Sequence, residues 1–157
     1  MENKIKSLAF HILVPIMLSF IIWMLIPDYT VFYNGLAKPA PQLPEEAFVI
    51  AWCAIYFLMG IAATVAEFSE ADQVYKQKAF NLYYLKLLVN LLWMPVMFGF
   101  RNLFVAAVWS VLLFVLTALV FWKFLKLNRK CGLLLLPYLL WTVFLIYYSV
   151  ALWIMNK

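Results

Sequence analysis

Five long, predominantly apolar runs constrain the fold of this sequence more than any other feature. A helix needs about 20 apolar residues to cross the hydrocarbon layer of a membrane, and each run is long enough to do so. The runs do not alternate in polarity like the strands of a porin-like barrel, and a helix satisfies its own backbone polar groups. The sequence therefore predicts one all-α domain over residues 1–157, an integral membrane bundle of five transmembrane helices at residues 8–26, 47–66, 80–100, 103–125 and 133–154.

The composition agrees with this fold class and excludes a soluble one. Of the 157 residues, 68% are hydrophobic and 12% are charged, and the mean hydropathy is +0.96. So few charges cannot cover a soluble core with a solvated surface. The formal net charge of +5 then reflects topology and contact with anionic headgroups, so we expect membrane lipid as a partner and no nucleic acid.

The basic residues predict the orientation of the bundle, because cytoplasmic connections carry an excess of lysine and arginine. With five spans, the N-terminus shares one side of the membrane with the second and fourth connections, and most basic residues lie on this side. Taking the membrane to be a bacterial plasma membrane, we therefore expect a cytoplasmic N-terminus. The cytoplasmic set is Lys4, Lys6, Lys76, Lys78, Lys123, Lys126, Arg129 and Lys130, and the outer set is Lys38, Arg101 and Lys157.

Side chains suited to nucleophilic or metal chemistry are scarce. The chain has one histidine, His11, and two cysteines, Cys53 in the second run and Cys131 in the fourth connection. A nucleophile needs a base beside it and a protein metal site needs several ligands, so neither can be assembled from these residues. We therefore expect no metal and no cofactor, a packing role for His11, and binding rather than enzymatic turnover.

Polar-tipped aromatic residues and one amide lie inside the predicted spans. They form pairs that are three or four residues apart, so the members of each pair share a helix face. If the three faces converge, they line a pocket of indole and phenol rings that suits a large, flat, aromatic ligand. The pairs are Trp52 with Tyr56, Asn90 with Trp93, and Trp141 with Leu145.

Asn90 has two interpretations, because an amide at membrane depth is costly unless it finds a partner or faces a polar cavity. It either forms a hydrogen bond between helices or contributes to the ligand pocket. Lys86 is one helical turn earlier in the same run. We expect its flexible stem to carry the ammonium group to the cytoplasmic interface.

The connection of residues 27–46 is rich in proline and contains the stretch NGLAKPAPQLPEEAF. Proline restricts the backbone, so such a loop loses less entropy on closing over a ligand than a glycine-rich loop does. We therefore predict that this connection is a semi-rigid lid over the pocket, stiffened by Pro39, Pro41 and Pro44.

Several motifs resemble the translocator protein family, also called the TspO/MBR family, tryptophan-rich sensory proteins or peripheral-type benzodiazepine receptors. FYNGLAKP at residues 32–39 is similar to the family's WY-x-x-L-x-KP. NLLWMPVMFGFR at residues 90–101 is similar to its N-x-x-W-x-P-x-x-FG-x-R, and PYLLWTVF at residues 137–144 adds a match in the last run. The motifs occur in the family's order and cover most of the chain.

This resemblance implies a five-helix bundle, commonly a homodimer, whose pocket opens toward the connection between the first two helices. Family members bind porphyrins such as protoporphyrin IX, haem and, in animals, sterols. Some bacterial members degrade protoporphyrin in light and oxygen, and the tryptophans implicated correspond to Trp52 and Trp141. The pocket positions that the resemblance implies are Tyr33, Trp52, Tyr56, Asn90, Trp93, Ser110, Trp141 and Leu145.

The sequence departs from the family pattern in three places. The usual W-x-P-P of the lid has become PQLP at residues 41–44, which removes an aromatic ring. Leu145 stands where the family has alanine, so we expect it to take up pocket volume. The animal sterol motif is not satisfied after Tyr148, since the next basic residue is Lys157, and we therefore do not expect tight sterol binding.

Three functional hypotheses follow. The first is a membrane receptor, sensor or transporter that binds porphyrins or similar flat hydrophobic molecules. The second is light- and oxygen-dependent degradation of protoporphyrin IX by the pocket tryptophans. The third is a structural membrane scaffold whose pocket is vestigial. We favour the first, although the sequence lacks the intramembrane charge pair and the inverted repeat that are typical of many transporters.

Overall fold

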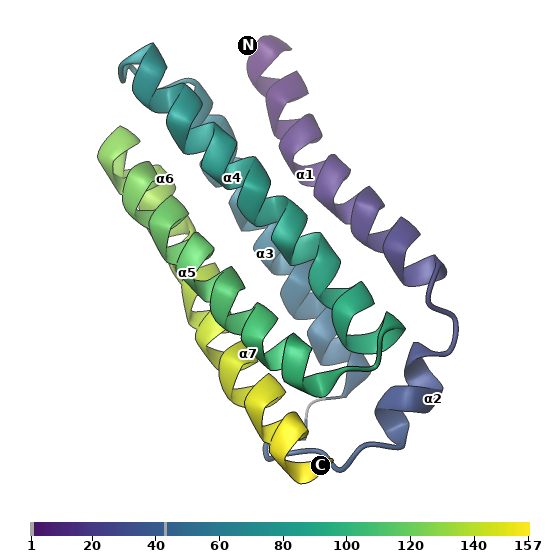
Figure 1. The fold of residues 1–157 in the computed structure, drawn as a ribbon. Coiled ribbons are helices and arrows are strands. Elements are labelled where there is room, and N and C mark those ends of the chain that lie inside the picture. The colour runs from purple at the N-terminus through teal and green to yellow at the C-terminus, as the bar shows by residue number, and fades with distance from the viewer. Residues whose placement is uncertain (1, 43) are drawn as a thin grey trace.

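The computed structural model describes residues 2–42 and 44–157, and within this part of the chain every regular element is a helix. Five segments are long and apolar enough to cross a membrane, which confirms the predicted all-α bundle. They run along a common direction (Figure 1). The elements are α1 (Glu2–Met24), α2 (Tyr29–Asn34), α3 (Glu45–Glu67), α4 (Gln73–Met94), η1 (Pro95–Gly99), α5 (Leu103–Leu127), α6 (Arg129–Leu134) and α7 (Leu136–Met155).

Several boundaries differ from the predicted ones. Helix α1 begins at Glu2 rather than at residue 8, because its polar first turns continue the helix beyond the apolar run. Helix α4 begins at Gln73 rather than at residue 80 because its polar first turns also continue the helix. The connection of residues 27–46, predicted to be a loop, contains α2. A six-residue helix is too short to show a helical period in the sequence, so it could not be recognised there.

Helix α4 does not stop at the family-like proline but widens there into the π-helical turn η1. Pro95 has no backbone N–H and cannot form the hydrogen bond of a regular helix at that position. The N–H of Phe100 instead donates to the carbonyl of Pro95 at 3.0 Å, which closes a wider turn. Such turns often occur at functional sites, and this one carries Phe98 toward the other helices.

Helices α1 and α3 approach each other closely at Gly60. A Cβ atom added there would lie 3.0 Å from the backbone nitrogen of Ile12 and 3.1 Å from the carbonyl carbon of His11. A small residue is what allows two membrane helices to approach each other this closely. Helix α1 is therefore held against α3 at this level.

The other helices form a tightly packed core around α5, which contacts α4, α6 and α7. Leu113 of α5 and Leu145 of α7 are both fully buried in it, together with Met97 of η1. The N-terminus lies at the end of the bundle where α3 meets α4 and α5 meets α6, whereas α2 and the C-terminus lie at the opposite end (Figure 1). The candidate ligand-binding site occupies the half of the bundle nearer α2.

Candidate ligand-binding site

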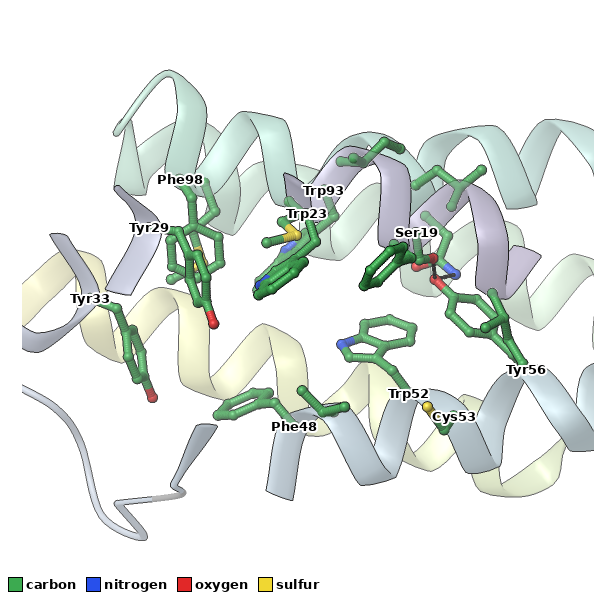
Figure 2. A pocket seen from close by; sticks show the side chains of 18 of the residues that line it. Ser19, Trp23, Tyr29, Tyr33, Phe48, Trp52, Cys53, Tyr56, Trp93 and Phe98 are labelled. Atoms are coloured by element: carbon green, nitrogen blue, oxygen red, sulfur yellow. Dashed lines mark hydrogen bonds between the residues drawn. The ribbon is translucent and has the colours of Figure 1, made fainter. Parts of the chain in front are cut away.

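A cavity of about 430 Å³ lies between α1, α3 and α4, and α2 covers one of its ends (Figure 2). Its volume falls within the range of about 300–1,000 Å³ that is typical of small-molecule sites. Most of its lining is aromatic or aliphatic. Such a cavity favours a ligand that is largely apolar.

Three polar side chains form the floor of the cavity, at the end away from α2. The hydroxyl of Ser19 donates to the hydroxyl oxygen of Tyr56 at 2.8 Å, and the amide of Asn90 donates to the same oxygen at 3.4 Å. These two bonds join α1, α3 and α4. Asn90 therefore bonds between helices and also lines the cavity, so the structure shows both arrangements that the sequence left open.

The wall of the cavity on α3 is built by Trp52. Its ring stacks on the ring of Tyr56 at a centroid distance of 5.7 Å. One turn before it, Phe48 also lines the cavity, and across from them lie Trp23 of α1 and Trp93 of α4 (Figure 2). Rings from three helices thus surround the space, and an inserted planar molecule would contact aromatic faces and edges.

Two tyrosines of α2 close the other end. Tyr29 and Tyr33 both line the cavity, and the ring of Phe98 lies 5.8 Å from Tyr29 and 6.1 Å from Tyr33. The hydroxyl groups of Tyr33 and Tyr148 are 2.6 Å apart and hydrogen-bonded. This bond ties α2 to α7 and so fixes the closed end.

The cavity is open on its side, between α1 and α3. Several of its lining residues on these two helices have a large exposed fraction, including 57% for Phe20 and 58% for Val49, and Cys53 is exposed as well. In a membrane this flank faces the hydrocarbon layer. The cavity therefore has an opening on the flank of the bundle, apart from the end that α2 closes.

The model of the TspO/MBR family matches residues 11–154, which is nearly the whole chain. The chain belongs to the TspO/MBR family. This confirms the resemblance seen in the sequence motifs.

Known relatives of this chain come from several microorganisms. A tryptophan-rich sensory protein of Cereibacter sphaeroides is 34% identical over 111 residues, which are 70% of this chain and 67% of the relative. The protein CrtK of Rhodobacter capsulatus is 27% identical over 128 residues, 80% of this chain and 78% of the relative. The tryptophan-rich protein TspO of Archaeoglobus fulgidus is 30% identical over 125 residues, 80% of each chain.

The eight pocket positions that the TspO/MBR resemblance implies divide into two groups. Five line the cavity: Tyr33, Trp52, Tyr56, Asn90 and Trp93. The other three, Ser110, Trp141 and Leu145, are not among the lining residues and lie behind the wall.

Ser110 acts on the cavity through Trp93. The indole N–H of Trp93 donates to the hydroxyl oxygen of Ser110 at 2.9 Å, and Ser149 is hydrogen-bonded to the same oxygen at 2.9 Å. Ser110 in turn donates to the carbonyl of Ala106. This network fixes the orientation of the Trp93 ring that faces the cavity.

Trp141 and Leu145 pack against the back of the α3 wall rather than extending it. The ring of Trp141 meets the edge of the Trp52 ring at 6.2 Å and that of Phe48 at 5.8 Å. Leu145 is fully buried in the core with Tyr148. The third predicted face therefore supports the cavity from behind, and Leu145 occupies core volume instead of cavity volume.

The three prolines predicted to stiffen a lid lie away from the cavity lining. Pro39 is buried, whereas Pro41 and Pro44 are exposed. Their segment is tied to α7, because Ala37 exchanges two backbone hydrogen bonds with the side chain of Asn156, at 2.8 and 2.9 Å. Helix α2 therefore closes the end of the cavity, and the proline segment that follows α2 holds the chain against the C-terminal end of α7.

The contribution of α1 was missed in the sequence. Ile16, Ser19 and Trp23 are spaced by three and four residues, so they share a helix face, and all three line the cavity. In the sequence, Trp23 sits near the end of a span and has the position of an interface anchor. The signal that could have found this face is Ser19, because a hydroxyl amid apolar residues indicates an inward orientation.

The expectation for Lys86 is wrong. Its side chain is completely buried and does not reach an interface. The ammonium nitrogen donates to the sulfur of Met59 at 2.8 Å and lies 4.3 Å from the centre of the Tyr138 ring. The stem points into the bundle because Met59 and the ring of Tyr138 hold the head group there.

His11 lies at the far end of the α1–α3 contact from the cavity. It is 4% exposed, packs edge-on against the ring of Tyr83 at 6.0 Å, and its Nε2 atom is 3.3 Å from a carboxylate oxygen of Glu67. Among the described residues, histidine, cysteine and carboxylate side chains form no group of three that could hold a metal ion. The His11–Glu67 pair joins α1 to α3.

Proposed function

We propose that this TspO/MBR protein is a membrane receptor or sensor that binds porphyrins and similar flat hydrophobic molecules in the cavity between α1, α3 and α4, with transport of the same ligands as a related role. The aromatic wall carries the proposal: Trp52, Trp93 and Tyr29 present rings to one space of about 430 Å³ (Figure 2). Membership in a family that includes a tryptophan-rich sensory protein supports a sensor or receptor role.

The chemistry of the cavity suits a macrocycle of this kind. Aromatic pairs contribute about 0.5–1.5 kcal/mol each beyond the apolar area that they bury. The rings around the cavity are already oriented by neighbours, as Trp93 is by Ser110, so little ordering is needed on binding. The floor around Asn90 gives the few polar groups that fix orientation.

We further propose that the protein is a homodimer in a plasma membrane with its N-terminus in the cytoplasm. Basic residues support the orientation, since those in the first turns of α1 and α4 and around the junction of α5 with α6 lie at one end of the bundle (Figure 1). The homodimer rests on the family resemblance. Light scattering in detergent tests the dimer, and protease access in sealed vesicles tests the orientation.

The binding proposal is tested by titrating purified protein with protoporphyrin IX in detergent in the dark, with tryptophan quenching as the signal. We expect saturable binding that weakens at least fivefold in Trp52→Leu, because this substitution removes a ring from the wall. A porphyrin-only titration corrects for absorption. Absence of saturable binding would instead support the scaffold hypothesis.

One contact favours photo-oxidative degradation as a second candidate function. Trp52 lines the cavity and touches Trp141 behind it, with centroids 6.2 Å apart. An excited porphyrin can take an electron from the Trp52 indole and pass it to oxygen, and an electron from Trp141 then refills Trp52 and leaves the oxidised site on Trp141. Illumination of the bound complex tests this function: a product that both Trp52→Phe and Trp141→Phe abolish supports it, and a product formed equally by both variants contradicts it.

A further inference from the structure

Lys86 is buried in the middle of α4 without an acidic partner among the described residues. Its side chain is 0% exposed, and its nitrogen has the sulfur of Met59 as a hydrogen-bond acceptor, which is a weak one. The chain's seven acidic residues all lie at helix ends or in connections. Beside Lys86, the hydroxyl of Tyr83 is also buried and has no hydrogen-bond partner in the described part of the chain. We call the buried space around Lys86, Met59 and Tyr83 the enclosure, and it contains more polar groups than hydrogen-bond partners for them.

The enclosure lies directly behind the floor of the cavity. Lys86 is one helical turn before Asn90, a rise of about 5.4 Å along the same face of α4. On the facing helix, Met59 follows Tyr56 by three residues, so it lies on the same face of α3. Asn90 and Tyr56 both line the cavity. One turn further from α2 on the same two helices, the amine of Lys86 contacts Met59.

Complete burial disfavours a charged amine at Lys86 while the cavity is empty, and an anion bound in the cavity favours the protonated form without touching it. The attraction between opposite charges falls only inversely with distance and is weakly screened away from water. An unpaired charge at membrane depth is costly, and intramembrane lysines usually have a partner. Among the described residues no carboxylate supplies that partner, so a bound ligand can.

We propose that the floor of the cavity is a carboxylate site, in which Asn90 and Ser19 donate hydrogen bonds to an acid group of the ligand and Lys86 supplies the opposite charge from one turn behind. Asn90 and Ser19 now donate to the Tyr56 hydroxyl, and the same N–H and O–H groups can donate to a carboxylate oxygen. The ligand class is an apolar ring system with an acid side chain, such as a tetrapyrrole that carries propionates. This inference rests on the proposed function and adds the feature by which the ligand is recognised.

The test compares protoporphyrin IX with its dimethyl ester, which has the same ring and no free acid. Dissociation constants of both are measured in the dark for the native protein and for Lys86→Met, which keeps a long unbranched side chain without charge. We expect the native protein to bind the acid at least tenfold more tightly than the ester. In Lys86→Met this ratio should fall to within about twofold of unity, with binding of the ester retained.

Lys78→Met is the matched control, because it removes the same charge from an exposed position on the same helix. Its acid-to-ester ratio should equal the native one. Partitioning of the two porphyrins into detergent is common to all variants, so the change in ratio isolates Lys86. Lys86→Gln replaces Lys86→Met if the latter does not fold.

Three results would overturn the inference. Equal affinity for acid and ester in the native protein would refute it and leave the proposed function standing. A ratio that is unchanged in the folded Lys86 variant would show that Lys86 is not the recognising charge. Failure of both porphyrins to bind the native protein would refute the proposed function together with the inference.

Discussion

Aromatic residues border both sides of α4, yet one side is hollow and the other is solid. Toward α1 and α3, rings such as Trp52 surround a cavity of about 430 Å³. Toward α5 and α7, Trp93 is hydrogen-bonded to Ser110, and Leu145 and Leu113 are both 0% exposed. Aromatic content therefore does not decide where a pocket forms. The difference is that α5 and α7 offer side chains that fill the space between rings, whereas α1 approaches α3 closely at Gly60 and leaves the region beyond it open.

Leu145→Ala is the most severe test of the claim that the α5–α7 side of α4 is solid and does not bind the ligand. On the solid side this substitution leaves a void, so we expect a loss of about 2–5 kcal/mol in unfolding free energy and a porphyrin affinity within about twofold of native. Unfolding in detergent and dark titration measure the two effects. Leu140→Ala is the control, because Leu140 is 62% exposed on the same helix. A gain of tenfold or more in affinity would show that Leu145 limits the ligand site after all.

Gly60→Ala tests whether the close contact between α1 and α3 shapes the cavity. The added methyl group would overlap Cγ1 of Ile12, so this side chain must move, and the α1 backbone there must give by a few tenths of an ångström. Overpacking of this kind costs about 1–3 kcal/mol, and because α1 is a cavity wall, we expect a severalfold loss of porphyrin affinity as well. In Gly99→Ala, where a Cβ would meet nothing within 4 Å, both quantities should stay near native. Equal effects of the two substitutions would contradict a tight α1–α3 contact.

Ser110→Ala tests whether the hydrogen bond from Trp93 to Ser110 orients the Trp93 ring that lines the cavity. The Trp93 N–H loses its acceptor, which costs about 1–3 kcal/mol for a buried donor, and the freed ring should weaken porphyrin binding by a few fold. Ser149→Ala leaves the bond between Trp93 and Ser110 in place, so its effect on affinity should be smaller. Thermal unfolding and titration of both variants give the comparison. The network has no part in holding Trp93 if Ser149→Ala weakens binding more.

Pro41→Gly should have the smallest effect. A proline-to-glycine change in an exposed loop costs about 0.4–1 kcal/mol through chain entropy, which corresponds to a loss of affinity of about fivefold at most if the segment orders α2. Titration of this variant measures that loss. A tenfold or larger loss would mean that the proline segment contacts the ligand directly.

Hydropathy alone predicted the five spans, because crossing a membrane fixes both the length and the polarity of a helix. Helical spacing also predicted the faces of Trp52 with Tyr56 and of Asn90 with Trp93, and both faces meet in the cavity. Spacing could not show which neighbour covers a face. For this reason the spacing of Trp141 and Leu145 did not reveal that Leu145 lies in the core instead of the cavity.

The two polar residues that the sequence placed least well were Ser19 and Lys86. Membrane-facing and inward-facing positions of α1 look alike because both are apolar, so its role as a cavity wall depended on one hydroxyl. A lysine near the middle of a span usually reaches an interface along its stem. Lys86 is instead buried against Met59 and Tyr138. Such contacts between distant segments are not visible in one sequence.

The most direct measurement for the cavity as the ligand site is a dark titration of the native protein, Val49→Trp and Ile50→Trp, followed by porphyrin absorbance. Both residues are exposed on α3, by 58% and 68%, but only Val49 lines the cavity. A new indole at residue 49 fills space that the ligand needs, so we expect at least a tenfold loss of affinity there and a native value for Ile50→Trp. Equal affinities for the two variants would contradict binding between α1, α3 and α4.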